Sequence, residues 1–283
     1  MRSGLARSIH PSHATVRVAA LVTFVSGTAA GVITLVQDEG IAEAARNGVL
    51  SGGAAFIAWA LTRELAPDHP LTAALAGVTA PWLLLAGPPD LLAAGLLILP
   101  VRIVAGTTGR DLTPVDLAAL GVGVAAATFR EVGVAVALAA ALAPGATAWW
   151  ARRARAALVA ASIAMTAIVV FLVTVFGDHD AWVSPAGFAR GLLVGGLAAG
   201  LVSAWVVPGV SSTVDSRRGG RISTSRVRLA RLTALTTAVA TALWAGGPGV
   251  LALGPAWAAL AVTAVSSIAT LGRNTPAIDS RTS

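Results

Sequence analysis

Lysine, cysteine and tyrosine are absent from this chain, and charged residues make up only 12% of it. Without lysine there is no Walker-A phosphate loop, no pyridoxal-phosphate Schiff base and no lysine nucleophile. Without cysteine there is no disulfide bond, no thiolate nucleophile and no cysteine-ligated zinc or iron–sulfur site. These absences exclude several large classes of enzyme before any residue pattern is considered.

Apolar residues take the place of the missing charge. They form 56% of the 283 residues, and the mean hydropathy is +0.79. A soluble domain carries roughly 25% charged residues. A soluble fold of this length does not have a core large enough to bury so much apolar surface. The composition therefore indicates an integral membrane protein.

Ten segments are apolar enough to cross a bilayer as α-helices, which need about 20 residues each. The clearest are Val18–Val36, Ala154–Phe176, Gly191–Val207 and Val250–Leu271. The shorter ones are Gly48–Thr62, Leu71–Gly87, Leu91–Gly106, Val115–Thr128, Val132–Trp149 and Leu232–Gly246. The sequence predicts an all-α, polytopic integral membrane helix bundle of about ten transmembrane helices, formed by residues 1–283 as a single domain.

The run from Val115 to Trp149 has two interpretations. Arg130 and Glu131 interrupt it, so they either form a short turn between two helices or lie in the middle of one long helix. One helix would reverse the orientation of one half of the chain and place a basic segment outside. We therefore favour two helices.

The arginines predict how the chain is threaded. With ten spans and a cytoplasmic N-terminus, all but four of the 20 basic residues fall in cytoplasmic segments, as the positive-inside rule requires. These segments include a 1–17 tail, a basic 211–231 loop and a 272–283 tail. Arg102 lies near the inner end of its span, and Arg46, Arg130 and Arg190 fall outside. We place both termini in the cytoplasm, at the plasma (inner) membrane of a prokaryote.

Three kinds of local feature predict details of the helices. Thr113-Pro114-Val115-Asp116 has the pattern of a helix start, with a capping threonine, a proline at the first helical position and a following acid. Pairs of glycines four residues apart allow helices to approach closely. They are Gly27 and Gly31, Gly48 and Gly52, Gly191 and Gly195, and Gly196 and Gly200. Pro81, Pro100 and Pro255 lie inside predicted spans and should kink them.

The densest group of polar residues is predicted at the cytoplasmic face. Its candidate substrate-binding residues are Arg63, Glu64, Asp68, His69, Arg102, Arg110 and Asp111. Arginines, carboxylates and one histidine at one membrane surface suit a phosphorylated lipid headgroup or a metal–phosphate. The alternative is that the arginines serve only topology and the prolines and acids only turns. Arg102 stands out because its neighbours are apolar, so we predict that it pairs with Glu64, Asp68 or Asp111.

The remaining charges predict partners rather than chemistry. The lipid bilayer is the main partner, and Arg217, Arg218, Arg221, Arg226 and Arg228 suit anionic lipid headgroups. The basic surplus lies beside apolar spans, so we do not expect nucleic acid as a partner. Asp178-His179-Asp180 is interpreted as a solvated outer loop, and we expect neither a metal site nor a cofactor.

The sequence leaves three classes of function open. The one we favour is a transporter or permease for a small organic solute or a lipid. An alternative is a membrane-embedded enzyme acting on a phospholipid or polyprenyl phosphate at the cytoplasmic face. A third is a structural or assembly subunit. Five helices per half would give halves of opposite orientation, as in inverted-repeat transporters.

The predicted threading has a direct test. Reporter fusions at Asp180 and at Arg221 should report opposite sides of the membrane, because one position lies in an outer and the other in an inner loop. The measurement is the activity of a reporter that folds on only one side. Two fusions reporting the same side would contradict the topology.

Overall fold

Helices account for nearly all of the chain that the structure describes. The computed structural model describes Leu5 and residues 14–108, 110–148, 150, 155–176, 185–207, 210–211 and 221–274. Within these ranges there are ten α-helices and two short 3-10 helices, and no β-strand element. All-α architecture, as predicted, is therefore the fold class of the described residues.

The helices follow the predicted apolar segments one for one. They are α1 (Ala14–Val36), α2 (Ile41–Leu65), α3 (Pro70–Thr79), η1 (Ala80–Leu85), α4 (Leu91–Ala105), α5 (Pro114–Thr128), η2 (Glu131–Gly133), α6 (Val134–Thr147), α7 (Arg155–Phe176), α8 (Gly187–Trp205), α9 (Thr224–Ala252) and α10 (Gly254–Asn274). Among the described residues, four helices (α1, α7, α8 and α9) are long and apolar enough to cross a membrane.

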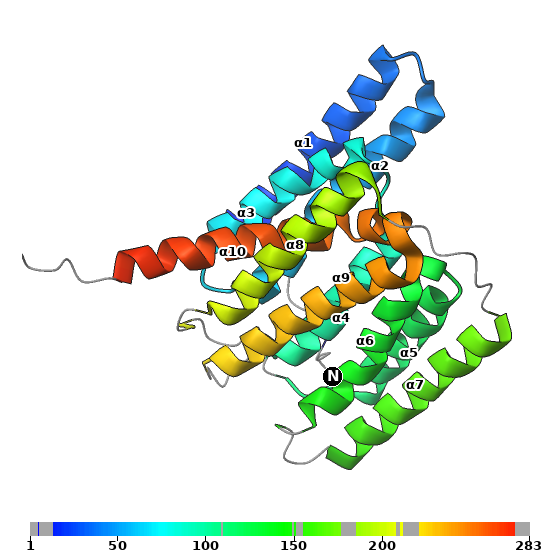
Figure 1. Ribbon diagram of the computed structural model, residues 1–283, viewed down its shortest axis with the longest axis vertical. Helices are drawn as coiled ribbons and strands as arrows, with labels where there is room; N and C mark the ends of the chain where they lie inside the picture. The colour runs from blue at the N-terminus through cyan, green and yellow to red at the C-terminus, as the bar shows by residue number, and fades with distance from the viewer. Residues whose placement is uncertain are drawn as a thin grey trace, which may run out of the picture.

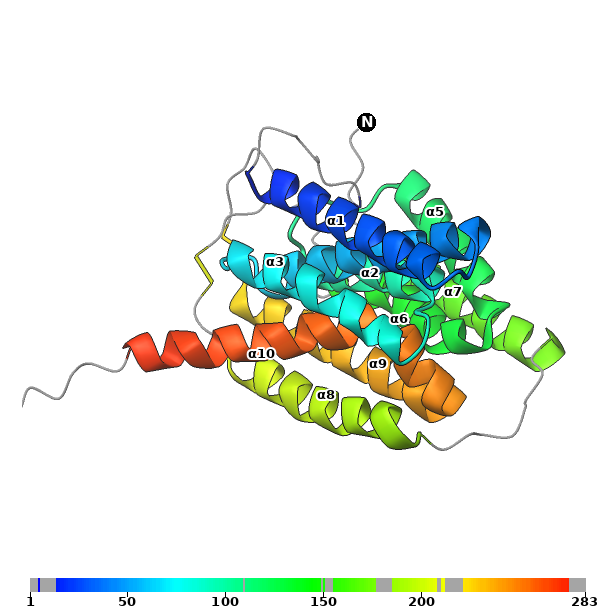
Figure 2. The ribbon, with the colours of Figure 1, turned by 90° about the horizontal axis from the view of Figure 1, so that it is seen from above.

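Most helices run alongside one another, from the lower left to the upper right of Figure 1. Seen from above, α1 lies along one edge, α2 and α3 come next, and α10 separates them from α8 on the far side (Figure 2). The interior is built mainly from alanine, leucine and valine of α2, α4, α6, α9 and α10, with Trp257 as the largest fully buried side chain. Small residues allow this close packing of helices.

The segment around Arg130 forms two helices, so the favoured interpretation is confirmed. Helix α5 ends at Thr128, and α6 begins at Val134 after the 3-10 turn η2. Arg130 and Glu131 are exposed in this turn rather than buried within a helix. The start of α5 also agrees with the prediction, because Thr113 Oγ1 accepts from Asp116 N (3.2 Å) and Asp116 Oδ2 accepts from Thr113 N (2.9 Å).

The break predicted between the last two spans lies next to a kink in the structure. The sequence placed it at 247–249, and the helix is broken at Gly246, after which a short helical stretch runs to Ala252 before α10 begins. Gly246 takes the positive φ of 61° that a side chain would oppose. Pro255 does not kink a span, because it lies in the first turn of α10, where its missing N–H costs nothing. Pro81 lies in η1, where the α-helix has already tightened to 3-10.

Contacts between the loops and helix ends show that successive helices alternate in direction. At one end, Asp68 after α2 meets Ser211 after α8, Thr107 after α4 meets Glu64 in α2, and Arg226 at the start of α9 meets Trp150 after α6. We call this end the arginine-rich face. At the other end, which we call the opposite face, Asp90 before α4 meets Arg130 after α5 and the backbone of Ala252. The pairing of these loops is the one that the predicted threading requires.

The five-plus-five arrangement is not confirmed. Helix α2 packs against α3 and α4, but its counterpart α7 packs against α5 and α6 and has no comparable contact with α8 or α9. The two halves of the described chain therefore do not repeat the same packing.

Two of the predicted glycine pairs meet each other. A Cβ built on Gly48 of α2 would lie 3.0 Å from the carbonyl oxygen of Gly27 in α1, and one built on Gly27 would lie 2.9 Å from the carbonyl oxygen of Gly48. Gly196 and Gly200 instead receive the side chains of Trp257 and Leu235. The α1–α2 hairpin thus depends on backbone-to-backbone contact that any side chain would prevent.

Leucine at Gly48 should therefore separate α1 from α2. Overpacking of this kind costs about 1–3 kcal/mol, because the blocking atoms belong to the backbone and cannot move aside. The measurement is the thermal midpoint at which the detergent-solubilised protein loses its monodisperse elution peak. Gly191→Leu is the matched control, since a Cβ there meets nothing within 4 Å. Equal midpoints for the two variants would contradict the role of the hairpin contact.

Candidate functional site

The predicted pairing of Arg102 is confirmed. Arg102, in the last turn of α4, donates from Nε to Glu64 Oε1 of α2 over 2.8 Å. The Glu64 side chain is fully buried, and that of Arg102 is 16% exposed. The other Glu64 oxygen accepts from Thr107 Oγ1, and Arg102 Nη1 donates to the Leu5 carbonyl over 2.9 Å. Protein groups therefore surround this pair on several sides.

The acid and histidine that follow α2 serve the loop in which they lie. Asp68 accepts hydrogen bonds from the backbone N of Ser211 (2.6 Å) and from its Oγ (3.1 Å). His69 stands at the N-cap position of α3, and its side chain makes no capping hydrogen bond. Asp68 thus connects the α2–α3 loop to the segment after α8 and does not reach the Glu64–Arg102 pair.

The other predicted site residues are spread over the same face. The guanidinium of Arg63 lies over the ring of Trp59, 5.9 Å from its centroid. Arg110 is half-buried and Asp111 exposed in the α4–α5 connection, and neither pairs with Glu64 or Arg102. The structure therefore brings together Glu64 and Arg102 and adds Thr107, while the remaining predicted residues occupy separate positions. Their role in substrate binding stays a prediction.

Arg226 donates hydrogen bonds to carbonyl groups at the end of helix α4. Its Nε donates to the carbonyl of Val104 (2.9 Å) and its Nη2 to that of Ile103 (3.0 Å). The last carbonyls of a helix lack intrahelical donors, and they carry the negative end of the helix dipole. The guanidinium also lies 5.4 Å from the ring centroid of Trp150. Arg226 is thus already bound within the protein, whereas Arg221 and Arg228 are exposed, and their binding of lipid headgroups stays a prediction. Arg217 and Arg218 lie outside the described residues.

Arg231 connects the ends of α2 and α8 to α10, and its role was missed from the sequence. It is 2% exposed and donates to the carbonyls of Leu65 in α2 (2.8 Å) and of Ser203 (2.5 Å) and Val206 (3.1 Å) at the end of α8. It also donates to Ser267 Oγ of α10 over 3.1 Å. Its apolar neighbours Ala230 and Leu232 could have indicated this role, because a cation flanked by apolar residues in a helix needs partners.

A cleft of about 750 Å³ lies near the opposite face, between the α1–α2 hairpin and the α3–η1 segment. Its volume is typical of a small-molecule site. Its walls are mainly apolar and include Leu21, Val25, Ile33, Trp82 and Leu85. Its polar end is formed by Gln37, Glu43, Arg46 and Asn47. This cleft was not predictable from the sequence, because its lining comes from four elements and from no recognisable motif.

A second hollow, of about 550 Å³, lies between α6 and α7. Its lining is apolar apart from Ser162 and Thr166, so it offers no charge for recognition. In the part of the chain that the structure describes, no three His, Asp or Glu side chains are grouped closely enough to hold a metal ion. Asp178, His179 and Asp180 lie outside that part.

The Glu64–Arg102 pair makes a prediction about stability. Arg102→Met should destabilise the protein by about 3–5 kcal/mol, because it leaves a buried carboxylate without its cation. Adding Glu64→Gln should recover part of this loss, since the neutral amide no longer needs a counter-charge. The measurement is a double-mutant cycle of unfolding in detergent. Additive effects of the two substitutions would contradict a coupled pair.

The comparisons with known proteins leave these geometric features as the basis for any functional argument. No protein-family model, no curated protein and no solved structure matches the chain.

Proposed function

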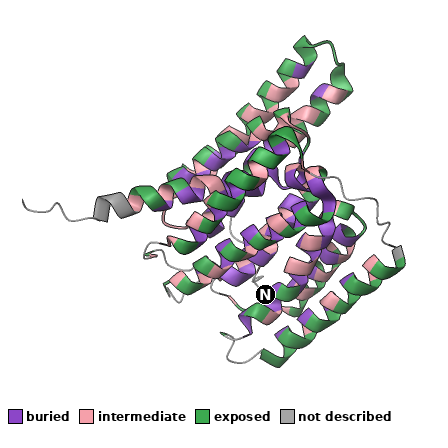
Figure 3. Ribbon diagram, in the orientation of Figure 1, coloured by how far each residue is buried: buried purple, intermediate pink, exposed green. Residues whose placement is uncertain are grey.

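We propose that the chain is a polytopic integral membrane protein of about ten spans, with the arginine-rich face and both termini in the cytoplasm of a prokaryote. The four membrane-length helices support this proposal. The exposed positions of α1, α7 and α8 in Figure 3 support it too, because large apolar side chains occupy many of them. Exposed tryptophans stand toward both ends of the bundle, as interfacial residues do. They are Trp82 and Trp244 toward the opposite face, and Trp150 and Trp205 toward the arginine-rich face.

Within that membrane, we propose that the protein is a permease for a small amphipathic solute or a lipid. The observation that carries this proposal is the cleft between α1, α2 and α3–η1, which combines a long apolar wall with one charged end. An amphipathic molecule matches both parts, since its tail is favoured against apolar side chains and its head against polar ones.

The length of the cleft favours passage over simple lipid contact. Its lining on α1 runs from Leu21 to Gln37. At a rise of 1.5 Å per residue, this stretch covers about 24 Å. One leaflet contributes only about 15 Å of hydrocarbon, half of a core of about 30 Å. A tail lying along α1 therefore extends beyond the leaflet in which its head is held.

The enzyme alternative has less support. It required a polar pocket at the arginine-rich face, formed by the loops that carry the predicted site residues. The best-placed members, Glu64 and Arg102, bind each other, Thr107 and the backbone of Leu5. Their charges are already compensated within the protein, which leaves little for a phosphorylated substrate. A structural subunit, the third alternative, has no need for an amphipathic cleft.

Blocking the cleft tests the permease proposal. Ala29 lines the cleft on α1, so Ala29→Trp should fill it. In vesicles containing a fluorescent phospholipid labelled on its tail, we expect lipid movement between leaflets with the native chain and the rate of protein-free vesicles with Ala29→Trp. The measurement is the loss of fluorescence when a membrane-impermeant quencher is added outside.

Ala20→Trp is the matched control, because Ala20 is an exposed alanine of the same helix outside the cleft lining. It should retain the native rate. Native protein that moves no lipid faster than protein-free vesicles would overturn a lipid as the substrate, and two variants with equal rates would overturn the role of the cleft.

A further inference from the structure

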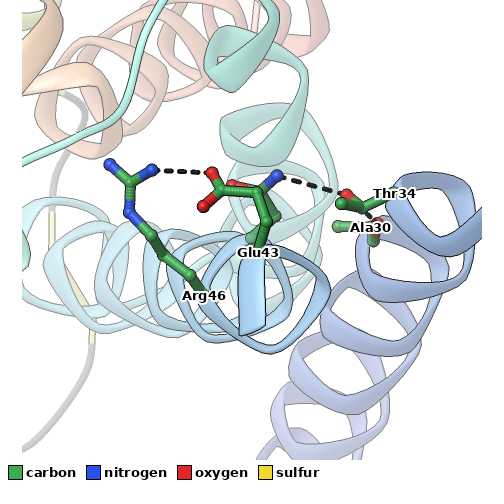
Figure 4. A network of polar contacts seen from close by, with 5 residues as sticks. Ala30, Thr34, Glu43 and Arg46 are labelled. Carbon is green, nitrogen blue, oxygen red and sulfur yellow. Dashed lines mark hydrogen bonds and ion pairs between the residues drawn. The ribbon is translucent and has the colours of Figure 1, made fainter. Parts of the chain in front are cut away.

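The charged end of the cleft contains one acidic and one basic residue, Glu43 and Arg46, on adjacent turns of α2. Arg46 Nη1 donates to Glu43 Oε1 over 2.7 Å. Asn47, the residue after Arg46 and one helical turn after Glu43, donates from Nδ2 to Thr34 Oγ1 of α1 (3.2 Å), and Thr34 Oγ1 donates to the Ala30 carbonyl (2.9 Å). Figure 4 shows the Glu43–Arg46 pair and the contacts to α1 side by side. Asn47 thus anchors this turn of α2 to α1, while the two charges remain toward the cleft.

The Glu43–Arg46 pair is easily exchanged for contacts with a ligand. The side chains are 38% and 58% exposed, and they are three residues apart on one helix. Such pairs contribute little to stability, because water screens them and both side chains lose freedom. The Glu64–Arg102 pair behaves differently, since the Glu64 side chain is fully buried and cannot exchange its partner for water. Of these two pairs, the one at the cleft is the one that a ligand opens at low cost.

We propose that the ligand of this cleft is a phospholipid whose headgroup carries a phosphate and a primary ammonium. This inference rests on the proposed function, and it names the class of molecule for that site. The phosphate binds Arg46, the ammonium donates to Glu43, and the acyl chain lies along α1 and η1. One internal ion pair is then replaced by two, with both charges compensated.

Ligands with one charge fit less well. An anionic headgroup would bind Arg46 but leave Glu43 without a partner, close to Asp38 and Glu39 in the α1–α2 connection. The acids here outnumber the single arginine, so the local electrostatic potential disfavours a ligand with a net negative charge. A quaternary ammonium balances Glu43 in charge but has no N–H to donate. A primary ammonium satisfies both requirements.

Lipid retention by the full-length protein tests this assignment. The protein is exchanged into mixed micelles with phosphatidylethanolamine, phosphatidylcholine or phosphatidylglycerol of identical chains, and native mass spectrometry counts the lipids that stay bound. We expect the ethanolamine lipid to be retained about two- to fivefold more than either other lipid, the factor expected of one solvent-accessible ion pair.

Single neutral substitutions give effects of different sign. Glu43→Gln should shift retention toward the glycerol lipid, because Arg46 is then unopposed. Arg46→Gln should weaken retention of all three phosphate-containing lipids and keep the ethanolamine lipid ahead of the glycerol lipid, because Glu43 still accepts from the ammonium. Glu131→Gln and Arg190→Gln are the controls, since both residues are exposed and neither lines the cleft. Equal retention of the three lipids by the native protein, or an unchanged ranking in both cleft variants, would overturn the headgroup assignment.

Failure of the headgroup assignment differs from failure of the proposed function. If Ala29→Trp lowers retention of all three lipids alike and the native protein shows no preference, the cleft binds tails and only the headgroup inference is wrong. If Ala29→Trp changes retention of none of them, the cleft is not the binding site and both proposals are wrong.

Discussion

The last carbonyls of several helices end inside the protein at the arginine-rich face, and they need hydrogen-bond donors there. Buried carbonyls without donors are costly, and the helix dipole adds negative charge at the same place. Arg226 and Arg231, from the first two turns of α9, supply donors to α4, α2 and α8. A guanidinium suits this task because it offers several donors and keeps its charge. The start of one helix thereby stabilises the ends of three others.

This arrangement separates a stabilised end of the bundle from an adaptable one. At the arginine-rich face, cations bind carbonyls and Glu64 inside the protein, and their geometry leaves them little freedom. At the opposite face, the α1–α2 hairpin stands beside α3–η1 and leaves a cleft whose charges are exposed. Ligand binding requires groups that can exchange partners, so the cleft is the better place for recognition. Arginines that serve topology in the sequence also serve helix ends in the structure.

Several features of the fold and the site could be read from the residues alone. Apolar length predicted each helix, and the capping pattern at Thr113 predicted the start of α5, because both depend on residues close in the chain. The pairing of Arg102 with an acid was predictable because an arginine among apolar neighbours needs a counter-charge near the helix end. The partner itself had three candidates, and only the approach of α4 to α2 selected Glu64.

Local chemistry in the sequence thus determined the helical class, the order of the helices, the two-helix interpretation around Arg130 and the need for a partner at Arg102. Tertiary structure alone decided that Arg231 binds three helices, and that α1, α2, α3 and η1 line a cleft. The physical reason is the distance along the chain over which each feature is determined. Helix formation depends on residues close in the chain, and the need of Arg102 for a counter-charge shows in its own apolar neighbours. A cleft is instead the space that the packing of several helices leaves between them. No sequence pattern within one helix predicts the space between several helices.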